Sequence, residues 1–370
     1  MNKKDRYIVI MAGGRGERFW PVSRESQPKQ LISLLSNRSF LQQTFDRVKP
    51  LVPLENIIVI TNLLQLSEVR KQLPDLPRKN IIGEPCGRDT CAAVALSTAI
   101  VGAHSENAVI AVLPADHFIA SEAKFRSVLL DSMRFAKSEI ALVTIGIKPE
   151  EPATGYGYIQ VDGEIRDSKS QSLKSTFFNV KRFVEKPDLS KAKRYLKNGG
   201  YRWNAGMFIW SYSSISREIK RQQPKLYAAV DRWLSINSLS KLNATLSAEY
   251  PKLNKISVDY AIMENAENIV CADGSFGWDD LGSWPALARH IKSDNNGNCS
   301  IGDIVQVDSS NNIIFDARKC NHTPIALVGI NDAIVVQSDD ATMIAAKSES
   351  QKIKQLVSKL AKDSRFKHLI

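Results

Sequence analysis

Short apolar runs alternate with amphipathic stretches along the first part of the chain. Apolar runs this short are typical of buried β-strands, and they predict strands over residues 7–11, 57–60, 81–82, 108–113 and 140–146. The stretches between them have helical periodicity and predict helices near residues 39–49, 65–73, 89–102 and 122–137. Strands separated by such helices are joined by right-handed crossovers, so we expect an α/β fold with a doubly wound, mixed and mostly parallel sheet. Ligands bind such sheets at the carboxyl ends of the strands.

The pattern changes after residue 154. A hairpin is predicted over residues 156–161 and 177–185, and a further strand over residues 203–210. Beyond a polar turn, short strands recur at residues 301–307, 312–315, 324–328 and 333–337, and a closing helix is predicted near 349–362. We therefore predict two domains, a large α/β domain over residues 1–290 and a small β-rich domain over residues 291–370. The strand spacing of the second domain permits a short left-handed β-helix.

The composition is that of an ordinary globular protein, with 370 residues of which 43% are hydrophobic and 24% charged. No run of about 18 uncharged apolar residues occurs, and the polar N-terminus leads into a strand instead of a signal-peptide core. We therefore expect a cytoplasmic protein with no membrane partner. The five cysteines include no CxxC pair, so we expect reduced thiols and no structural zinc.

The net charge of +11 favours an anionic partner, which could be a nucleic acid, a membrane surface or a phosphorylated small molecule. Charge alone does not choose among these. The sequence has no clustered basic runs interleaved with aromatic residues, and nothing in it resembles a helix-turn-helix or an RNA-binding sheet. We therefore expect small-molecule substrates and no nucleic acid.

A glycine-rich segment with basic residues follows the first predicted strand. A dinucleotide fingerprint would need a glycine in place of Phe19, and a P-loop would need a Gly-Lys dipeptide, which the sequence lacks. Successive backbone N–H groups can instead form a concavity for an anion, and Arg18 and Lys29 are long enough to reach a bound polyphosphate. The alternative is a tight turn with solvated basic residues. The residues predicted to bind the nucleotide here are Ala12, Gly13, Gly14, Arg15 and Gly16.

This segment resembles the signature of the sugar nucleotidyltransferases, and within them most closely that of the mannose-1-phosphate guanylyltransferases. The family pattern is Gly-Gly-x-Gly-Thr-Arg-Leu, then Trp-Pro, then Pro-Lys-Gln. This chain follows it from Gly13 to Gln30, with Glu17 for threonine and Phe19 for leucine. Because a carboxylate would repel a triphosphate, we expect Glu17 to point away or to pair with Arg15. The resemblance implies a Rossmann-like, GT-A-like catalytic domain over residues 1–290.

Residues 83–90 match the family's Glu-Pro-x-x-Arg-Asn-Thr segment, with Asp89 in place of asparagine. The resemblance implies that Glu84, Arg88 and Thr90 bind the nucleotide. A carboxylate such as Glu84 can accept hydrogen bonds from N1–H and N2–H of guanine, and uracil or thymine could not satisfy it similarly. The alternative is a loop in which Asp89 or Thr90 caps the next helix.

Two aspartates are implied as ligands of Mg²⁺, the cofactor of the family. Asp116 lies in a segment that resembles the family's Leu-Pro-x-Asp-His, and Asp280 in one that resembles Trp-x-Asp-Val-Gly-Ser-Trp. By that match Asp280, and not Asp279, is the ligand, and Asp116 also contacts the nucleotide. Mg²⁺ usually binds through one or two carboxylates and substrate phosphates. We therefore expect Asp116 and Asp280 to lie close together.

Further matches imply a site for the sugar phosphate. Tyr156 and Gly157 belong to a motif whose backbone a sugar can approach, and Asn204 offers an amide to sugar hydroxyls. Glu185 is expected to accept hydrogen bonds from the hydroxyls, while Lys186 holds the 1-phosphate. We interpret residues 257–264 as a helix that packs Tyr260 and Met263 inward, with Asp259 supporting the sugar site.

The resemblance implies transfer of GMP from GTP to mannose 1-phosphate by in-line attack on the α-phosphorus, with Arg18 and Lys29 as the catalytic residues. Alternatives are transfer to another hexose 1-phosphate, such as glucose 1-phosphate, and a catalytically silent regulatory homologue. The larger bacterial relatives carry an additional isomerase domain, which we do not expect here. A homodimer formed through the C-terminal domain is a further expectation.

Overall fold

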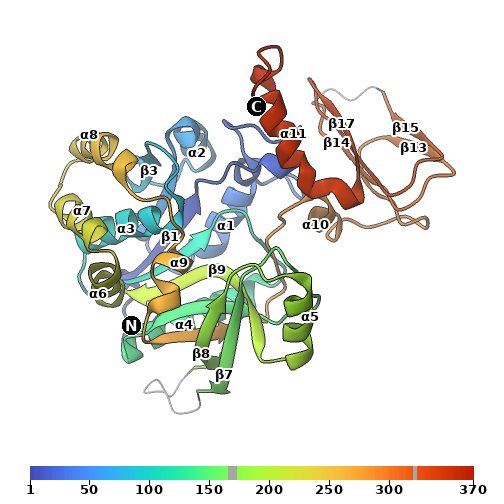
Figure 1. Cartoon of the computed structure of the whole chain (residues 1–370). Coiled ribbons are helices and arrows are strands. Elements are labelled where there is room, and N and C mark those ends of the chain that lie inside the picture. The colour runs from blue at the N-terminus through green and yellow to red at the C-terminus, as the bar shows by residue number, and fades with distance from the viewer. Residues whose placement is uncertain (166–172, 320–322) are drawn as a thin grey trace. The chain divides into compact units, whose positions relative to one another are not determined.

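The computed structural model describes residues 1–165, 173–319 and 323–370 (Figure 1). The chain forms two compact units that alternate along the sequence. The first unit comprises Met1–Gly13, Thr44–Ala115 and Ile119–Trp278, and the second comprises Gly14–Gln43, Asp116–Phe118 and Asp279–Ile370. Most of the glycine-rich segment therefore belongs to the same unit as the C-terminal residues. The sequence-based division at residue 290 stays a prediction.

The first unit is built on a nine-stranded sheet with the strand order β3-β2-β1-β4-β9-β6-β10-β8-β7. Strands β1, β2, β3 and β4 run parallel, and β9 lies antiparallel between β4 and β6. This mixed α/β sheet confirms the predicted fold class. The strands are β1 (Arg6–Ala12), β2 (Ile57–Asn62), β3 (Ile81–Glu84), β4 (Val109–Pro114), β6 (Leu142–Ile147), β7 (Tyr158–Glu164), β8 (Phe177–Val184), β9 (Tyr201–Ser211) and β10 (Ile269–Asp273).

Nine helices of the described chain lie wholly or, for α1, partly in the first unit: α1 (Phe40–Val48), α2 (Leu66–Gln72), α3 (Asp89–Gly102), α4 (Glu122–Glu139), α5 (Leu189–Asn198), α6 (Tyr212–Gln222), α7 (Pro224–Leu234), α8 (Leu239–Glu249) and α9 (Val258–Ala261). The prediction that a strand starts at Ile140 is wrong. Ile140 instead ends α4 in the left-handed conformation, with φ of 55°, because the helix must reverse there before β6 begins.

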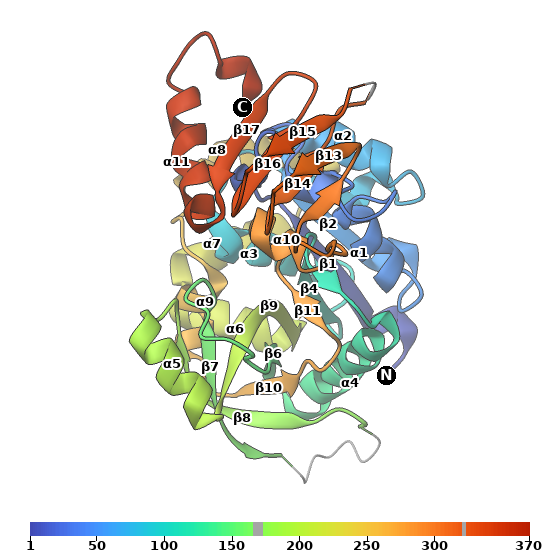
Figure 2. The same ribbon diagram turned by 90° about the vertical axis from the view of Figure 1, so that its right-hand side faces the viewer.

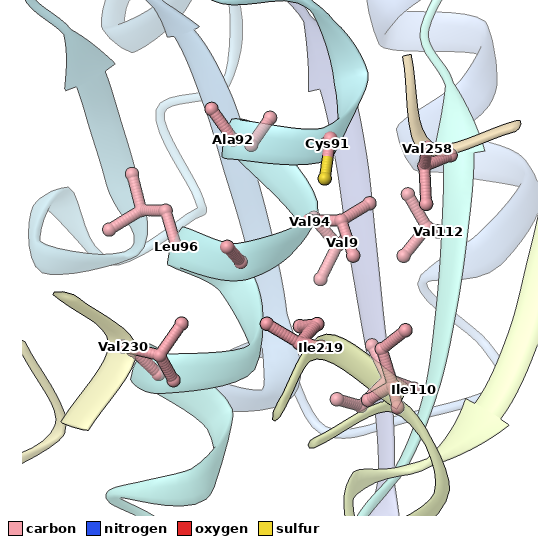
Figure 3. Packing of buried hydrophobic residues seen from close by; sticks show 14 of the residues in the cluster. Val9, Cys91, Ala92, Val94, Leu96, Ile110, Val112, Ile219, Val230 and Val258 are labelled. Atoms are coloured by element: carbon pink, nitrogen blue, oxygen red, sulfur yellow. The ribbon is translucent and has the colours of Figure 1, made fainter. Parts of the chain in front are cut away.

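Helix α3 forms the centre of the first unit's core. It is apolar on all sides, and helices of this kind are buried. Figure 3 shows Val94 of α3 facing Val9 of β1, with Val230 of α7 beside the helix. This packing holds the amino end of α3, which carries Arg88 and Thr90, next to the carboxyl end of β3.

The second unit contains a four-stranded sheet in the order β12-β14-β16-β17 and a pair formed by β13 and β15 (Figure 2). β12, β14 and β16 are mutually parallel, as are β13 and β15, which agrees with the predicted β-rich domain. Gly302, with φ of 113°, interrupts the strand predicted over 301–307, and β17 was not predicted. The elements are β12 (Cys299–Ile301), β13 (Ile304–Val307), β14 (Ile313–Asp316), β15 (Ile325–Val328), β16 (Ala333–Gln337), β17 (Thr342–Ala346), α10 (Trp284–Ala288) and α11 (Ile353–Leu360).

Aromatic side chains join the glycine-rich segment to the C-terminal elements inside the second unit. The ring of Phe19 lies 5.1 Å from that of Trp284, which lies 5.2 Å from that of Phe315. The indole N–H of Trp20 donates to the carbonyl oxygen of Leu369 at 2.9 Å. The segment that begins with Gly14 is thus anchored in a core that the C-terminal strands complete.

Among the described residues, Cys86, Cys91, Cys271 and Cys299 are free thiols, as the sequence predicts. The fifth cysteine, Cys320, lies outside the described residues. In the described part of the chain, no helix has the length and apolar character needed to cross a membrane.

Candidate active site

The glycine-rich loop is held by the segment that follows it. Gly16 has φ of 62°, and a Cβ atom on it would lie 2.5 Å from the backbone nitrogen of Lys29, so only glycine fits. The side chain of Gln30 donates to the carbonyl oxygen of Gly14 at 2.9 Å. Within the described residues, the backbone N–H groups of Gly14, Arg15 and Gly16 donate no hydrogen bond. These N–H groups are available to an anion, as predicted for a phosphate-binding loop.

Lys29 connects the two predicted metal ligands. Its Nζ donates to Oδ2 of Asp116 at 2.9 Å and to the backbone oxygen of Asp280 at 2.5 Å. The Lys29 side chain is only 5% exposed, and Nζ lies within 6 Å of the ring centres of Phe19 and Phe40. The structure therefore brings Asp116 and the Asp280 loop to one ammonium group.

The carboxyl group of Asp116 is favoured in its ionised form. Burial raises its pKa, but the positive charge of Lys29 and that of His117 outweigh burial, so that the pKa lies below its usual value. Asp116 therefore pairs with the Lys29 ammonium as a charged group, at 2.9 Å.

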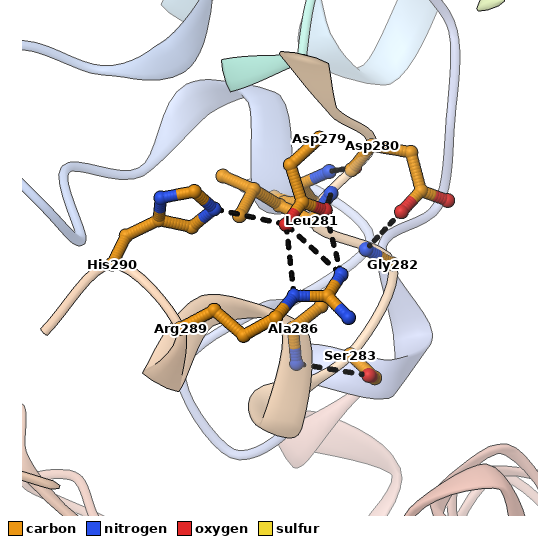
Figure 4. Close-up of polar contacts among 9 residues, drawn as sticks. Asp279, Asp280, Leu281, Gly282, Ser283, Ala286, Arg289 and His290 are labelled. Atoms are coloured by element: carbon orange, nitrogen blue, oxygen red, sulfur yellow. Dashed lines mark hydrogen bonds and ion pairs between the residues drawn. The ribbon is translucent and has the colours of Figure 1, made fainter. Parts of the chain in front are cut away.

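The loop that carries Asp280 is fixed by its neighbour Asp279 (Figure 4). The buried carboxylate of Asp279 accepts hydrogen bonds from Leu281 N–H, from the guanidinium of Arg289 at 2.9 to 3.1 Å, and from Nε2 of His290 at 2.9 Å. Arg289 and His290 directly follow α10, and no sequence signal pointed to them. Their contacts commit Asp279 to a structural role.

The Asp280 carboxylate lies apart from this cluster. Its Oδ1 accepts the backbone N–H of Gly282 at 3.0 Å, as Figure 4 shows. Within the described residues there is no group of three or more His, Cys, Asp or Glu side chains that could hold a metal ion. Mg²⁺ usually binds through one or two protein carboxylates and completes its coordination with water and substrate phosphates, so binding by Asp116 and Asp280 stays a prediction.

The arginines of the loop differ in their contacts. The Arg15 guanidinium lies 3.7 Å from Glu17 and 3.9 Å from Glu25, so the predicted pairing of Glu17 with Arg15 is present. Arg18 lies on the 3₁₀ turn Glu17–Phe19 and is exposed. Its guanidinium makes no ion pair or hydrogen bond with the described residues. Arg18 is therefore available to a ligand.

Glu84 ends β3 and is 7% exposed. Its Oε1 accepts a hydrogen bond from the hydroxyl of Tyr250, a residue that sequence reasoning missed because the two lie 166 positions apart. Burial raises the pKa of Glu84 to about 7, although the Tyr250 hydrogen bond lowers it. A buried acceptor with a pKa this close to neutrality is typical of a functional site.

Arg88 and Thr90 connect the Glu84 loop to a distant segment. The Arg88 guanidinium donates to the carbonyl oxygens of Tyr250 and Pro251, and the Thr90 hydroxyl accepts the N–H of Val258 at 2.8 Å. The N-cap position of α3 is Arg88, which makes no side-chain cap, but Oδ1 of Asp89 accepts the N–H of Thr90 at 2.9 Å in the first turn. The capping alternative therefore holds in part for Asp89 and not for Thr90. Direct contact of Arg88 and Thr90 with a nucleotide stays a prediction.

The predicted sugar-site residues Glu185, Lys186 and Asn204 lie in the first unit. Lys186 is 64% exposed, and its Nζ lies 2.7 Å from Oε1 of Glu185, which raises the pKa of Lys186. The Asn204 amide donates to Asp259 at 2.6 Å, and its oxygen accepts from Thr144. Burial raises the pKa of Asp259 to about 6, although the Asn204 hydrogen bond lowers it. Asp259 therefore contacts Asn204, and its support of a sugar site stays a prediction.

Aromatic rings surround the other sugar-site motif. The ring of Tyr156 lies edge-on to those of Trp203 and Trp278, at 5.0 and 5.4 Å, and the Gly157 carbonyl accepts the Asn204 N–H at 2.8 Å. The prediction that Tyr260 packs inward is wrong, because α9 is a single turn and Tyr260 is 48% exposed on it. Met263 is fully buried, as predicted.

Comparisons with known proteins agree along the whole chain. The family model described as nucleotidyl transferase matches residues 7–297, and the model described as MannoseP isomerase/GMP-like beta-helix domain matches residues 302–360. The chain is 34% identical to mannose-1-phosphate guanylyltransferase of Escherichia coli K12 over 387 residues, covering 100% of this chain and 76% of that protein. It is 35% identical to the xanthan biosynthesis protein XanB of Xanthomonas campestris over 358 residues, covering 95% and 72%.

A solved structure is similar over nearly the same length. The crystal structure of mannose-1-phosphate geranyltransferase from Thermus thermophilus superposes with a TM-score of 0.82 at 31% identity, covering 96% of this chain and 99% of that one. The mannose-6-phosphate isomerase of Helicobacter pylori, at 22% identity and a TM-score of 0.58, shares the fold.

Proposed function

Because this chain belongs to the mannose-1-phosphate guanylyltransferase family of nucleotidyltransferases, we propose that it transfers GMP from GTP to α-D-mannose 1-phosphate, releasing pyrophosphate. The observation that carries the proposal is the buried Lys29 ammonium, which contacts both Asp116 and the Asp280 loop. The Lys29 ammonium lies between two acidic residues and belongs to the segment that also holds the glycine loop. A positive charge in this place suits a reaction among phosphate groups.

Each substrate group has a candidate partner of complementary chemistry. The free N–H groups of the glycine loop and the exposed Arg18 bind the triphosphate, and Glu84 accepts hydrogen bonds from the guanine edge. The Lys186 ammonium binds the sugar 1-phosphate as a point charge, while Glu185 and Asn204 bind sugar hydroxyls. Asp116 and Asp280 would hold Mg²⁺, which when bound neutralises charge on the reacting phosphates.

The chemistry needs no protein nucleophile. An oxygen of mannose 1-phosphate attacks the α-phosphorus of GTP, and the bond from that phosphorus to the bridging oxygen of the β-phosphate breaks. The electron pair leaves with pyrophosphate, whose charge Arg18 and Lys29 stabilise. Catalysis is then alignment of the reactants and stabilisation of charge by groups already in place.

The proposal is tested by measuring pyrophosphate release from GTP, ATP, UTP, CTP and dTTP, each with mannose 1-phosphate or glucose 1-phosphate, with and without Mg²⁺. We expect metal-dependent release that is fastest with GTP and mannose 1-phosphate. Release that is fastest with glucose 1-phosphate would change the assigned sugar. No release with any pair would contradict the catalytic role and favour a regulatory homologue.

The affinity for GTP is expected to depend on the ionisation of Glu84. The carboxylate form accepts hydrogen bonds from N1–H and N2–H more strongly than the protonated form, which turns one oxygen into a donor, and burial raises the pKa of Glu84 to about 7. Affinity is therefore complete above about pH 8 and falls as the pH drops through 7, by roughly tenfold per pH unit below the pKa. Isothermal titration of GTP without the sugar phosphate, from pH 6 to 8.5, measures this.

The Glu84→Gln variant is the matched control for this pH dependence. It keeps the shape of the side chain and one acceptor oxygen but has no group that titrates. We expect its GTP affinity to be weak and almost constant over the same range. A wild-type affinity that stays constant between pH 6 and 8.5 would remove Glu84 from the guanine site.

A further inference from the structure

The hydroxyl of Tyr250 contacts the carboxylate of Glu84, which we propose binds guanine. Tyr250 is fully buried, begins the 3₁₀ turn Tyr250–Lys252 after α8, and donates to Oε1 of Glu84. Its ring stacks on Trp233, with ring centres 6.1 Å apart. The guanidinium of Arg88 holds the backbone carbonyl of Tyr250, so both ends of this residue are fixed against the Glu84 loop.

The neighbouring residue strengthens this arrangement. Glu249 accepts the indole N–H of Trp233 at 3.0 Å and two hydrogen bonds from Arg232 at 2.9 and 3.2 Å. The stacked pair of Trp233 and Tyr250 is therefore held between α7 and the end of α8. The Tyr250 hydroxyl has little freedom to leave Glu84.

The second oxygen of Glu84 faces the end of β1. A Cβ atom on Gly13 would lie 3.1 Å from Oε2 of Glu84, so the absence of a side chain at Gly13 leaves that oxygen uncovered. Within the described residues, Oε2 accepts no hydrogen bond, although Glu84 is only 7% exposed. Among the described side chains, Oε2 is not one of the fully buried polar atoms that lack a partner, so this oxygen is accessible and a ligand can donate to it.

The direction of the Tyr250 hydrogen bond determines which groups of a base can bind to Oε2 of Glu84. Burial and the nearby charge of Glu84 raise the pKa of Tyr250, so the hydroxyl keeps its proton and acts as a donor. The hydroxyl donor on Oε1 favours the ionised form of the Glu84 carboxylate. It also fixes the orientation of the carboxylate, because the terminal torsion of a glutamate side chain otherwise varies over a broad range. Oε2 is then an oriented acceptor, which suits the N–H donors of guanine and opposes the N1 lone pair of adenine.

We propose that Tyr250 is a specificity-determining positioning residue, whose hydroxyl fixes Glu84 with Oε2 presented beside Gly13 as the acceptor for guanine. The inference rests on the proposed function, in that the base bound here is guanine. Tyr250 itself contacts Glu84 and not the base. Its removal should therefore change the choice of nucleotide more than the rate of the chemical step.

The test is the Tyr250→Phe variant, compared with the wild type and with Tyr7→Phe. Tyr7 is also buried in the first unit, at 6% exposure, but lies at the amino end of β1, away from Gly13. We expect Tyr250→Phe to lower the ratio of kcat/KM for GTP to that for ATP by roughly tenfold, the effect of one hydrogen bond to a charged group. The kcat at saturating GTP should change by less than about threefold, and Tyr7→Phe should match the wild type.

A double variant distinguishes an effect of Tyr250 that acts through Glu84 from a general loss of order in the site. If Tyr250 acts through Glu84, adding Tyr250→Phe to Glu84→Gln causes little further loss of GTP preference. A full additional tenfold loss in the Glu84→Gln background would overturn the inference. If Tyr250→Phe does not fold, 3-fluorotyrosine at position 250 keeps the ring and strengthens the donor, and we expect it to increase the preference for GTP.

The outcomes distinguish the inference from the proposed function. A wild type that prefers GTP, together with a Tyr250→Phe variant that keeps the same preference, overturns the role of Tyr250 and leaves the proposed reaction intact. A wild type with no preference for GTP over ATP contradicts the assignment of guanine to Glu84, and the inference falls with it.

Discussion

Replacing Lys29 with methionine should lower kcat by roughly 100-fold or more, because the variant loses the buried ammonium that we assign to the charge developing on the leaving pyrophosphate. Methionine keeps much of the apolar stem of a side chain whose Nζ lies within 6 Å of the ring centres of Phe19 and Phe40. The measurement is kcat with saturating GTP, mannose 1-phosphate and Mg²⁺, with circular dichroism to establish that the fold is intact.

Two variants control this result. Lys49→Met removes a lysine just after α1 whose Nζ pairs with Asp46 at 2.8 Å, and it should leave kcat unchanged. Lys29→Arg keeps the positive charge but replaces the compact ammonium group with a larger, planar guanidinium group, so it should recover only part of the activity. A folded Lys29→Met enzyme with a kcat near that of the wild type would refute the assigned role.

The Asp280→Asn variant should need at least tenfold more Mg²⁺ for half-maximal activity, with kcat lowered by roughly 100-fold. Asparagine can still accept the Gly282 N–H, and the backbone oxygen that contacts Lys29 is unchanged, so the loop should keep its shape. The variant therefore removes the charge of one proposed metal ligand. The measurement is a Mg²⁺ titration of pyrophosphate release.

Asp363→Asn is the matched control for Asp280→Asn. Asp363 also accepts the backbone N–H of the second residue after it, Arg365, at 3.0 Å, but it belongs to the segment after α11 and to no proposed site. Its Mg²⁺ titration should match the wild type. An Asp280→Asn enzyme with the wild-type titration would show that Asp280 holds no catalytic metal.

Candidate site residues could be proposed from the sequence because each motif is local. Hydrophobic periodicity indicated the parallel strands, and short motifs marked Glu84, Asp116 and Asp280. The partners of these residues were not predictable, since Lys29 meets Asp116 across 87 positions and Tyr250 meets Glu84 across 166. Pairing over such separations is set by the packing of whole elements, which no local pattern records.

Errors at element boundaries have separate physical reasons. Ile140 looks like part of a strand because it is apolar, yet the end of α4 places it in a left-handed conformation. The inward position predicted for Tyr260 depends on a helix over residues 257–264, but α9 is a single turn that ends at Ala261. Burial in both cases depends on where an element ends, and apolar character alone does not give that position.

The shared aromatic core of the second unit limits how proteins of this kind can be recombined. Phe19, Trp20 and Phe40 pack with Trp284 and Phe315, so the support of the glycine loop is divided between two distant parts of the chain. A chimera that takes only its C-terminal strands from a relative would combine core residues from two proteins. Those residues would not have evolved to pack against each other. Residues 14–43 and 279–370 are therefore expected to be inherited together, and a functional exchange would have to transfer both.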